Sequence, residues 1–571
     1  MKKILSTVLA VLTGVGCLFM GTGCLPKDEI VRDEKTVNLR LYKAGFGDAF
    51  IYELKEKFEA AYASEGYILN VLKPQYTYAG TPMVQEMAEG YDRKGIDLYV
   101  TGAIMPNEVS PIGMYANGNE LCEDLEDLVF NQTAINYDGT ESANKISERL
   151  SSDYVPFLRA DNGKMYGFTW AQTSAGLVVN TKKLEAYGIT EMPRTTNELF
   201  AIFETVLNGI DGVIEGSAKT KTYPLTYNLN ADQGGATTYN TCAYEQWLAQ
   251  YDLQAFNEFN RMQTMDENGE WQDMTEGWRV FENENIKPVL ETSFQFMDKK
   301  YAAPGSGDTT KKLDQIQSLV MKDVLNKKGN PQVNAIFMLN GDWFLNEVKS
   351  SYGDYLNDIA FINVPVISSL GVEIFSKYGL SDAECDEVLS YVCKQVDENK
   401  TVDEIVELLK TEKQLTADKA DVQRVATARG LCFARGIEHL AFIPKGCTKK
   451  DIAAKVLRMM ASDDFANTFM RASNAFSPYT KGVDIKGLYP FVDQAKALTD
   501  NIHFRAFAGR IQGIRRSVMR TDYMFPGARN MAYDLYSRAD NLSYAEAAQK
   551  MYSESLTTVQ GYWDDYISNK E

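Results

Sequence analysis

The side chains best suited to chemistry in this sequence are aromatic rings and polar groups at the ends of predicted strands. Trp170 follows the short stretch 166–169, and Asp342 and Trp343 follow the apolar run 335–339. Loops at strand ends of an α/β scaffold commonly present side chains to ligands. Flat rings beside carboxylates, amides and guanidinium groups suit a sugar, which has apolar C–H faces and a polar rim. The candidate ligand-binding residues are Phe46, Asp48, Tyr76, Tyr78, Trp170, Trp247, Asp342, Trp343 and Arg435, although each of them could instead serve packing.

Motifs for catalysis, cofactors or metals are weak. The chain has only two histidines, His439 and His503, which leaves little room for histidine catalysis or a multi-histidine metal site. The run Gly45-Phe46-Gly47 resembles the start of a dinucleotide-binding loop, but Phe50 occupies the third glycine position and no acidic residue closes the next strand. The stretch 216–220 lacks the spacing of a phosphate-binding loop. We therefore expect no catalytic residue, no cofactor and no metal.

Length and charge narrow the class of protein. A chain of 571 residues exceeds the roughly 250–300 residues at which single cores stop growing, so more than one domain is expected. Its 44% hydrophobic and 11% aromatic content is typical of a globular protein. The formal net charge is −19; removing residues 1–23 takes away Lys2 and Lys3, which gives −19 − 2 = −21. Such an acidic surface argues against nucleic acid and against broad attachment to anionic lipid.

The N-terminal segment 1–23 has the pattern of a secretory signal. Lys2 and Lys3 precede an apolar run, 4–20, that ends at Gly21-Thr22-Gly23-Cys24. A small residue before cysteine at this place resembles a bacterial lipobox, which predicts lipidation at Cys24. Cys17 is a rival that comes too early in the apolar run, and an uncleaved membrane anchor is the other alternative. Acylation would hold the protein at a membrane surface.

Six further cysteines show no CxxC pair and give no indication of a zinc site. Burial as small apolar residues is the simplest reading, and disulfides stay open for an exported chain. They are Cys122, Cys242, Cys385, Cys393, Cys432 and Cys447.

The order of predicted elements favours an α/β fold. Strands at 37–42, 67–72 and 96–100 alternate with helices that begin at Asp48 and Thr81, which is the pattern of a parallel sheet. Later elements include a helix that starts at a capping box of Thr195 and Glu198, and strands at 335–339, 359–367 and 440–446. Residues 371–430 are predicted to form a helical insertion. The C-terminus is expected to be helical.

The stretch 161–184, DNGKMYGFTWAQTSAGLVVNTKKL, resembles the segment that crosses between lobes in family 1 extracellular solute-binding proteins. That family supplies the carbohydrate-capturing subunits of ABC importers, and maltose-binding protein is a member. Its pattern is roughly D-G-K-x-Y-G, a few apolar residues, then G-L-x-Y-N-K. The stretches 121–128, 192–199, 335–343 and 450–466 resemble further motifs of the family. The matching residues are Asp161, Gly163, Lys164, Tyr166, Gly167, Gly176, Leu177, Asn180 and Lys182, while Asn162 and Thr181 are insertions and Val179 replaces an aromatic residue.

This resemblance implies a periplasmic-binding-protein-like fold of two discontinuous α/β lobes joined by a hinge, with the helical insertion 371–430. The expected organisation is a signal peptide at 1–23, a lipidated tether at 24–36, lobe one at 37–168 with 439–500, and lobe two at 172–434 with 501–571. The implied function is capture of an oligosaccharide or related polar solute between the lobes and delivery to an ABC importer permease. We expect a non-enzymatic, lipid-anchored monomer at the extracellular face of the cytoplasmic membrane.

Two other functions stay open at this point. A surface glycoside hydrolase or lyase would need two facing carboxylates, and with 78 acidic residues the sequence nominates no pair. A binding protein for iron would need a cluster of tyrosines and carboxylates that the sequence does not locate, and one for a polyamine would need several cleft carboxylates with aromatic walls. The sequence does not identify the solute, its length, the permease or the role of the insertion.

Overall fold

The fold is described from a computed structural model. It describes residues 29–43, 45–75, 80–101, 115–116, 119–150, 154–159, 163–209, 221–229, 240–321, 333–434, 439–479, 489–500, 504–507, 514–515, 518 and 542–569. The chain divides into two compact units, one formed by 1–148, 158–168 and 439–465 and the other by 149–157, 169–438 and 466–571. Cys24, Tyr76, Tyr78 and Arg435 lie outside the described residues.

The first unit is built on a five-stranded sheet in the order β2-β1-β3-β16-β8. Strands β1, β2 and β3 are parallel, and β16 pairs antiparallel with β3. Helices α2 and α18 pack together, and α2 contacts β2. The unit comprises β1 Thr36–Tyr42, α2 Ala49–Ala61, β2 Ile68–Val71, α3 Gly80–Ala88, α4 Tyr91–Lys94, β3 Leu98–Thr101, β4 Tyr115–Ala116, β5 Asn119–Glu120, β6 Thr133–Ile135, β7 Glu141–Lys145, α5 Ile146–Arg149, β8 Phe168–Thr169, β16 Leu440–Phe442 and α18 Lys450–Met460.

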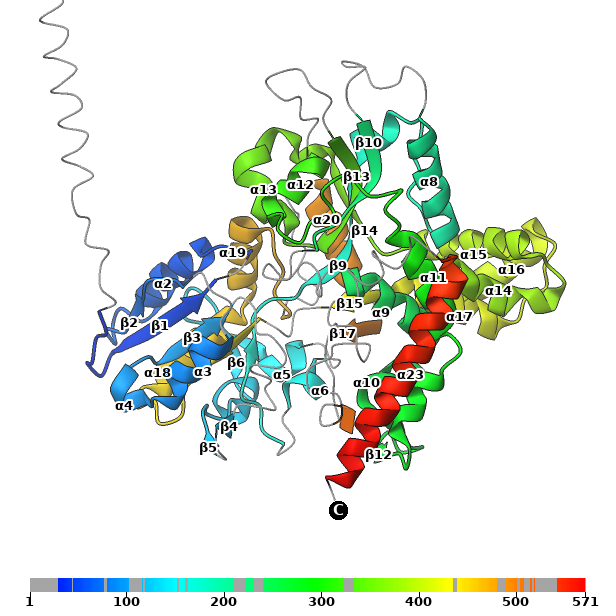
Figure 1. The fold of residues 1–571 in the computed structure, drawn as a ribbon. Coiled ribbons are helices and arrows are strands. Elements are labelled where there is room, and N and C mark those ends of the chain that lie inside the picture. The colour runs from blue at the N-terminus through cyan, green and yellow to red at the C-terminus, as the bar shows by residue number, and fades with distance from the viewer. Residues whose placement is uncertain are drawn as a thin grey trace, which may run out of the picture. The chain divides into compact units, whose positions relative to one another are not determined.

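The second unit is built on a six-stranded sheet in which β10, β13, β9, β15 and β17 follow one another and β14 also pairs with β9. Helix α8 covers β10, α12 covers β13, and the C-terminal helix α23 lies along α11 (Figure 1). The elements before the insertion are β9 Ser174–Asn180, α7 Thr181–Glu185, α8 Thr196–Asn208, β10 Lys221–Thr226, α9 Asn240–Tyr251, α10 Leu253–Arg261, β11 Gln263–Met265, β12 Trp271–Asp273, α11 Ile286–Phe296, α12 Leu313–Met321, β13 Val333–Gly341, α13 Phe344–Tyr352 and β14 Ile359–Ile362. Those after it are β15 Leu431–Ala434, α19 Asp463–Ser473, α20 Pro490–Asp500, β17 Phe504–Phe507 and α23 Tyr544–Ser568, and α6 spans Val155–Leu158.

The predicted helical insertion is present as four helices, α14 Ser368–Phe375, α15 Asp382–Asp397, α16 Val402–Glu412 and α17 Lys419–Gly430. Ser381 and Thr401 begin α15 and α16 with complete capping boxes. Cys385 and Leu389 of α15 are buried, as their spacing on one helical face predicts. The insertion therefore has a small apolar core of its own.

Local signals fixed the start of several elements. The Asn180 side chain accepts a hydrogen bond from the Lys183 amide at 3.0 Å and caps α7. The Thr195 hydroxyl accepts from the Glu198 amide at 3.3 Å, but the Glu198 carboxylate accepts from the amide of Arg194, one residue earlier than a capping box requires. Only half of that predicted capping box is formed.

Two predicted boundaries differ from the structure. Residues 466–500 were expected in lobe one, but Met470, Phe476 and Phe491 belong to an apolar cluster of the second unit that also contains Val178. Their apolar side chains thus pack against the second sheet.

The predicted tether 24–36 is also too long, because residues 29–36 contact the first unit and Thr36 already belongs to β1. Among the described residues, no helix has both the length and the apolar character needed to cross a membrane.

Candidate functional site

The start of β9, within the predicted crossing segment 161–184, lies beside the end of β13. We call this end of the second unit's sheet its edge. Strand β9 runs antiparallel to β13 and β15, so the start of β9 adjoins the ends of both neighbours. The Asp342 amide donates to the Ser174 carbonyl at 3.1 Å, and the Ser174 amide donates to the Asp342 carboxyl at 3.0 Å. Ala434 pairs with Ser174 from the other side. The turn at 341–343, the start of β9 and the residue before the predicted Arg435 therefore come together.

Asp342 is an ionisable side chain at this edge. Complete burial raises the pKa of Asp342 to about 8, and the hydrogen bonds from Ser174 and from the Trp343 amide only partly oppose this shift. The group is consequently mostly protonated at neutral pH. A neutral carboxyl group both donates and accepts hydrogen bonds, as a sugar hydroxyl does.

The three predicted tryptophans differ in their surroundings. Trp170 is 1% exposed and its ring meets that of Phe469 edge-on with centroids 5.4 Å apart. Trp343 is 9% exposed, and a Cβ on Gly341 would come within 2.2 Å of its ring, so glycine is required there. Both rings are thus packed within the second unit, with Trp343 the less enclosed. Their contact with a ligand stays a prediction.

Trp247 has a separate environment. It is 1% exposed, its indole N–H donates to the Pro365 carbonyl at 3.0 Å, and its ring meets Phe296 edge-on. These partners differ from those of Trp170 and Trp343. The structure therefore does not group Trp247 with the edge at Ser174 and Asp342, and its predicted role is likewise untested.

Several polar residues of this edge were not predicted from the sequence. The Gln172 amide donates to the Phe476 carbonyl at 2.7 Å, which places the segment 476–479 beside the crossing segment. The hydroxyl of Thr173 is buried and has no hydrogen-bond partner among the described residues. The signal that could have found them is the polar run Gln172-Thr173-Ser174 within an otherwise apolar stretch.

In the first unit, the predicted residues Phe46 and Asp48 lie beyond the carboxyl end of β1. Phe46 is buried and its ring meets that of His439 edge-on at 5.0 Å. The Asp48 carboxylate pairs with the Lys43 ammonium at 2.9 Å and keeps 31% of its side chain exposed. Lys43 also donates its amide to the Gln75 carbonyl, so the ends of β1 and β2 are tied together. The Asp48 side chain makes no capping hydrogen bond to α2.

Other features of the described residues do not add to this site. The six cysteines predicted to be buried are buried. The described part of the chain has no group of three or more histidine, cysteine, aspartate or glutamate side chains able to hold a metal. A cavity of about 830 Å³ in the second unit involves none of the predicted ligand residues; it is lined by Phe361, Ile362, Asn363, Val396, Asp397, Asn399, Lys400, Thr401, Val402, Gln423, Ala426, Thr427, Arg429, Gly430, Gln494, Ala497 and Leu498.

Comparison with known proteins rests on the fold. No protein-family model and no curated protein matches the sequence. Among solved structures, a chitin oligosaccharide binding protein aligns with a TM-score of 0.53 at 12% identity over 92% of this chain and 99% of its own. The binding protein RafE in complex with raffinose gives 0.52 at 11% over the same shares, and a probable secreted solute-binding lipoprotein from Streptomyces coelicolor gives 0.51 at 11%, also over 92% and 99%. These similarities confirm the predicted fold, that of the two-lobed extracellular solute-binding proteins.

Proposed function

We propose that this protein is a non-enzymatic binding protein that captures an oligosaccharide or a related polar solute and delivers it to the permease of an ABC importer. The observation that carries the proposal is that Ser174, Asp342 and Trp343 lie together where β9 starts and β13 ends. In α/β folds, ligands collect at the carboxyl ends of strands. Support also comes from the similarly folded proteins, which are described as binding a chitin oligosaccharide and raffinose.

The groups at this edge suit a neutral polyhydroxylated ligand. A protonated Asp342 can donate to a ring oxygen or accept from a hydroxyl, and it carries no charge that would demand a cation. The Thr173 hydroxyl offers a second polar contact. A polyamine would instead favour an ionised carboxylate. The edge chemistry therefore favours a sugar over a cationic solute.

The mode of capture expected from the sequence, enclosure of the solute between two lobes, is part of this proposal. Phe46 and Asp48 are the proposed contributors from the first unit, and Tyr76, Tyr78 and Arg435 are further proposed ligand contacts. A hinged binding protein closes only as far as its ligand binds the closed form more tightly than the open one.

Anchoring outside the cell completes the proposal. Cleavage before Cys24 and acylation of that cysteine would hold the monomer at the extracellular face of the cytoplasmic membrane, near the permease. The Gly-Thr-Gly-Cys ending of the apolar N-terminal run supports this.

A thermal-shift screen of the mature chain against a glycan library tests the proposed class of ligand. A ligand that binds only the folded state raises the melting temperature. We expect at least one oligosaccharide to do so in wild type and in Glu347→Gln, which alters a partly buried acid on α13, and to do so much less in Asp342→Ala. A shift produced by polyamines and by no glycan would contradict the proposal.

A further inference from the structure

Residues 29–35, which the sequence analysis assigned to a tether, form a docked strap on the first unit. The Val31 amide donates to the Asn38 side-chain oxygen at 3.0 Å, and the Asn38 side-chain amide donates back to the Val31 carbonyl at 2.8 Å. The Asn70 side chain donates to the Glu29 carbonyl at 2.8 Å. The guanidinium of Arg32 donates to the carbonyls of residues 92 and 93 at 2.9 and 3.0 Å. The strap is therefore fixed at both ends and in its middle.

The surface beneath the strap is shaped to receive it. Gly95 has φ +65 and ends α4, and a Cβ there would come within 2.7 Å of Ile30 and 3.2 Å of Arg32. A side chain at position 95 would thus displace the strap. Asp33 accepts hydrogen bonds from the amides of Lys35 and Thr36 at 2.8 and 2.6 Å, which turns the chain directly into β1.

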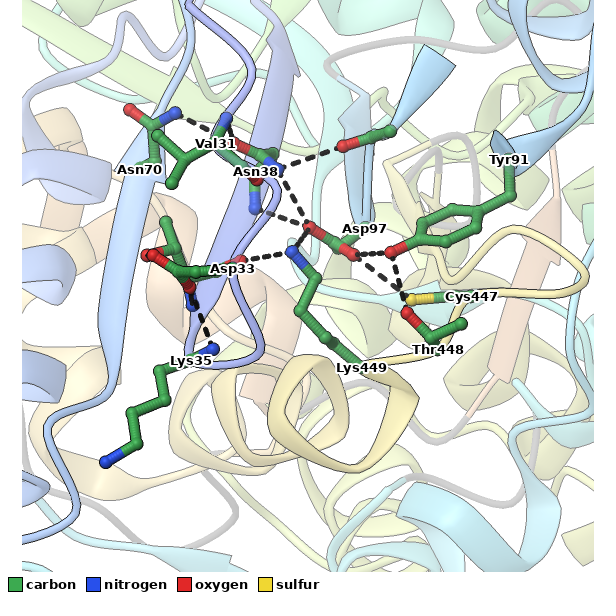
Figure 2. A network of polar contacts seen from close by, with 12 residues as sticks. Val31, Asp33, Lys35, Asn38, Asn70, Tyr91, Asp97, Cys447, Thr448 and Lys449 are labelled. Carbon is green, nitrogen blue, oxygen red and sulfur yellow. Dashed lines mark hydrogen bonds and ion pairs between the residues drawn. The ribbon is translucent and has the colours of Figure 1, made fainter. Parts of the chain in front are cut away.

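A buried polar network holds this end of the unit together (Figure 2). Asp97, fully buried, pairs with the Lys449 ammonium at 2.9 Å and accepts from the Asn38 amide at 2.8 Å. Tyr91 donates to its other oxygen at 2.7 Å, and so does the Cys447 thiol at 3.4 Å. Asn38 thus links the strap to the segment that returns to the first unit late in the chain. Such a network is rigid when all its polar groups are paired, because the loss of one partner would leave a buried charge unpaired.

The strap contacts lie towards the amino end of β1: Asn70 is level with Asn38, the third residue of β1, and residues 92–95 precede β3. These strands are parallel, so their carboxyl ends, with Phe46 and Asp48, form the opposite rim of the sheet. The seven residues of β1 separate the two rims by about 20 Å. The strap and the proposed ligand contacts of this unit therefore lie on opposite rims.

We infer that the strap holds the amino-terminal rim of the first unit's sheet against a lipid membrane, with its carboxyl-terminal rim directed away from that membrane. This rests on the proposed acylation at Cys24. From Cys24 to Glu29 the chain reaches at most roughly 18 Å, whereas a free tether up to Thr36 would reach roughly 43 Å. The short reach limits both the height of the first unit above the bilayer and its rotation.

Hydrogen exchange on the full mature chain tests the docking itself. Amides of Val31 and Thr36 are expected to be protected in wild type and in Glu34→Ala, which changes an exposed strap residue. The double variant Arg32→Ala/Asn70→Ala is expected to lose at least about tenfold of that protection, because three hydrogen bonds to backbone carbonyls are removed. Unprotected Val31 and Thr36 amides in the wild type would overturn the inference.

Energy transfer to acceptor lipids tests the orientation. The acylated protein, labelled at Asp92→Cys on the strap rim or at Lys73→Cys beyond the carboxyl end of β2, is bound to phosphatidylcholine–phosphatidylglycerol vesicles that carry a headgroup acceptor. Transfer is expected to be stronger from position 92, and a twelve-residue Gly-Ser insertion after Asp28 is expected to abolish most of the difference. Equal transfer from both positions, or failure of the protein to attach to vesicles, would overturn the inference. Neither result touches carbohydrate binding, which the glycan screen tests separately.

Discussion

Ser174 and Asp342 exchange hydrogen bonds across the start of β9 and the end of β13: each donates its backbone amide to the other, at 3.0 and 3.1 Å. The carboxyl oxygen that accepts from Ser174 belongs to a group whose pKa is raised to about 8 by burial. The protonation state of Asp342 is therefore coupled to the backbone position of the crossing segment at Ser174.

The first prediction concerns pH. The folded protein holds the Asp342 proton up to about pH 8, whereas the unfolded chain releases it near pH 4, so the folded state binds more protons between these values and stability falls as pH rises through this window. Asp342→Asn removes this titration. Denaturation curves at several pH values are expected to show a variant that gains stability relative to wild type between pH 5 and pH 8.

Glu347→Gln is the matched control, because burial also raises the pKa of Glu347, to about 7. It is expected to remove a separate part of the same decline, and the double variant should be the flattest of the four proteins. A wild-type stability that rises with pH over this window, or an Asp342→Asn protein with the same profile as wild type, would contradict the assignment.

The second prediction separates packing from binding at the tryptophans. Trp170→Ala is expected to lower the free energy of unfolding by about 3–5 kcal/mol, since its ring is enclosed against Phe469. Trp343→Ala is expected to weaken oligosaccharide binding by about 2 kcal/mol, roughly thirtyfold. Denaturation curves measured beside calorimetric titrations of the folded proteins distinguish the two effects. Trp563→Phe, at a buried ring of α23 that is not among the predicted ligand residues, serves as a control that should leave affinity unchanged. A Trp343→Ala protein that binds normally would place the ligand elsewhere.

The third prediction is that a fragment ending near residue 168 does not fold. Strand β16, from 440–442, lies between β3 and β8 in the first sheet, and Lys449 neutralises the buried Asp97. A fragment of 29–168 would lose both the strand and the counter-ion, and an unpaired buried charge is strongly destabilising. Circular dichroism and a denaturant titration measure the outcome. A fragment that unfolds cooperatively would show that the returning segment is dispensable.

The fourth prediction concerns the anchor. Cys24→Ser is expected to move the protein from the membrane fraction to the medium, because acylation requires the thiol. Fractionation with metabolic labelling by a fatty acid measures this, and Cys17→Ser is the matched control that should stay membrane-bound and labelled. Retention of the Cys24→Ser protein, with label on Cys17, would move the lipidation site.

Local sequence signals predicted the helices and strands. Contacts between residues far apart in the sequence could not be predicted in this way. The cap at Thr195 and the strand at 37–42 were readable because capping and strand formation depend on neighbours in sequence. The docking of Val31 on Asn38 was not readable, because it depends on Gly95 and Asn70, which lie far along the chain. Likewise, a ring at a loop position looks available in sequence, and only the fold shows that Phe469 encloses Trp170.

The most direct measurement is calorimetric titration of the mature wild-type protein with the oligosaccharide that raises its melting temperature most, followed by analysis of the recovered sugar. We expect saturable binding of one oligosaccharide per protein, recovery of that sugar unchanged, and roughly thirtyfold weaker binding by Trp343→Ala. Release of new reducing ends from the sugar, or equal affinity in the two proteins, would contradict the proposed function.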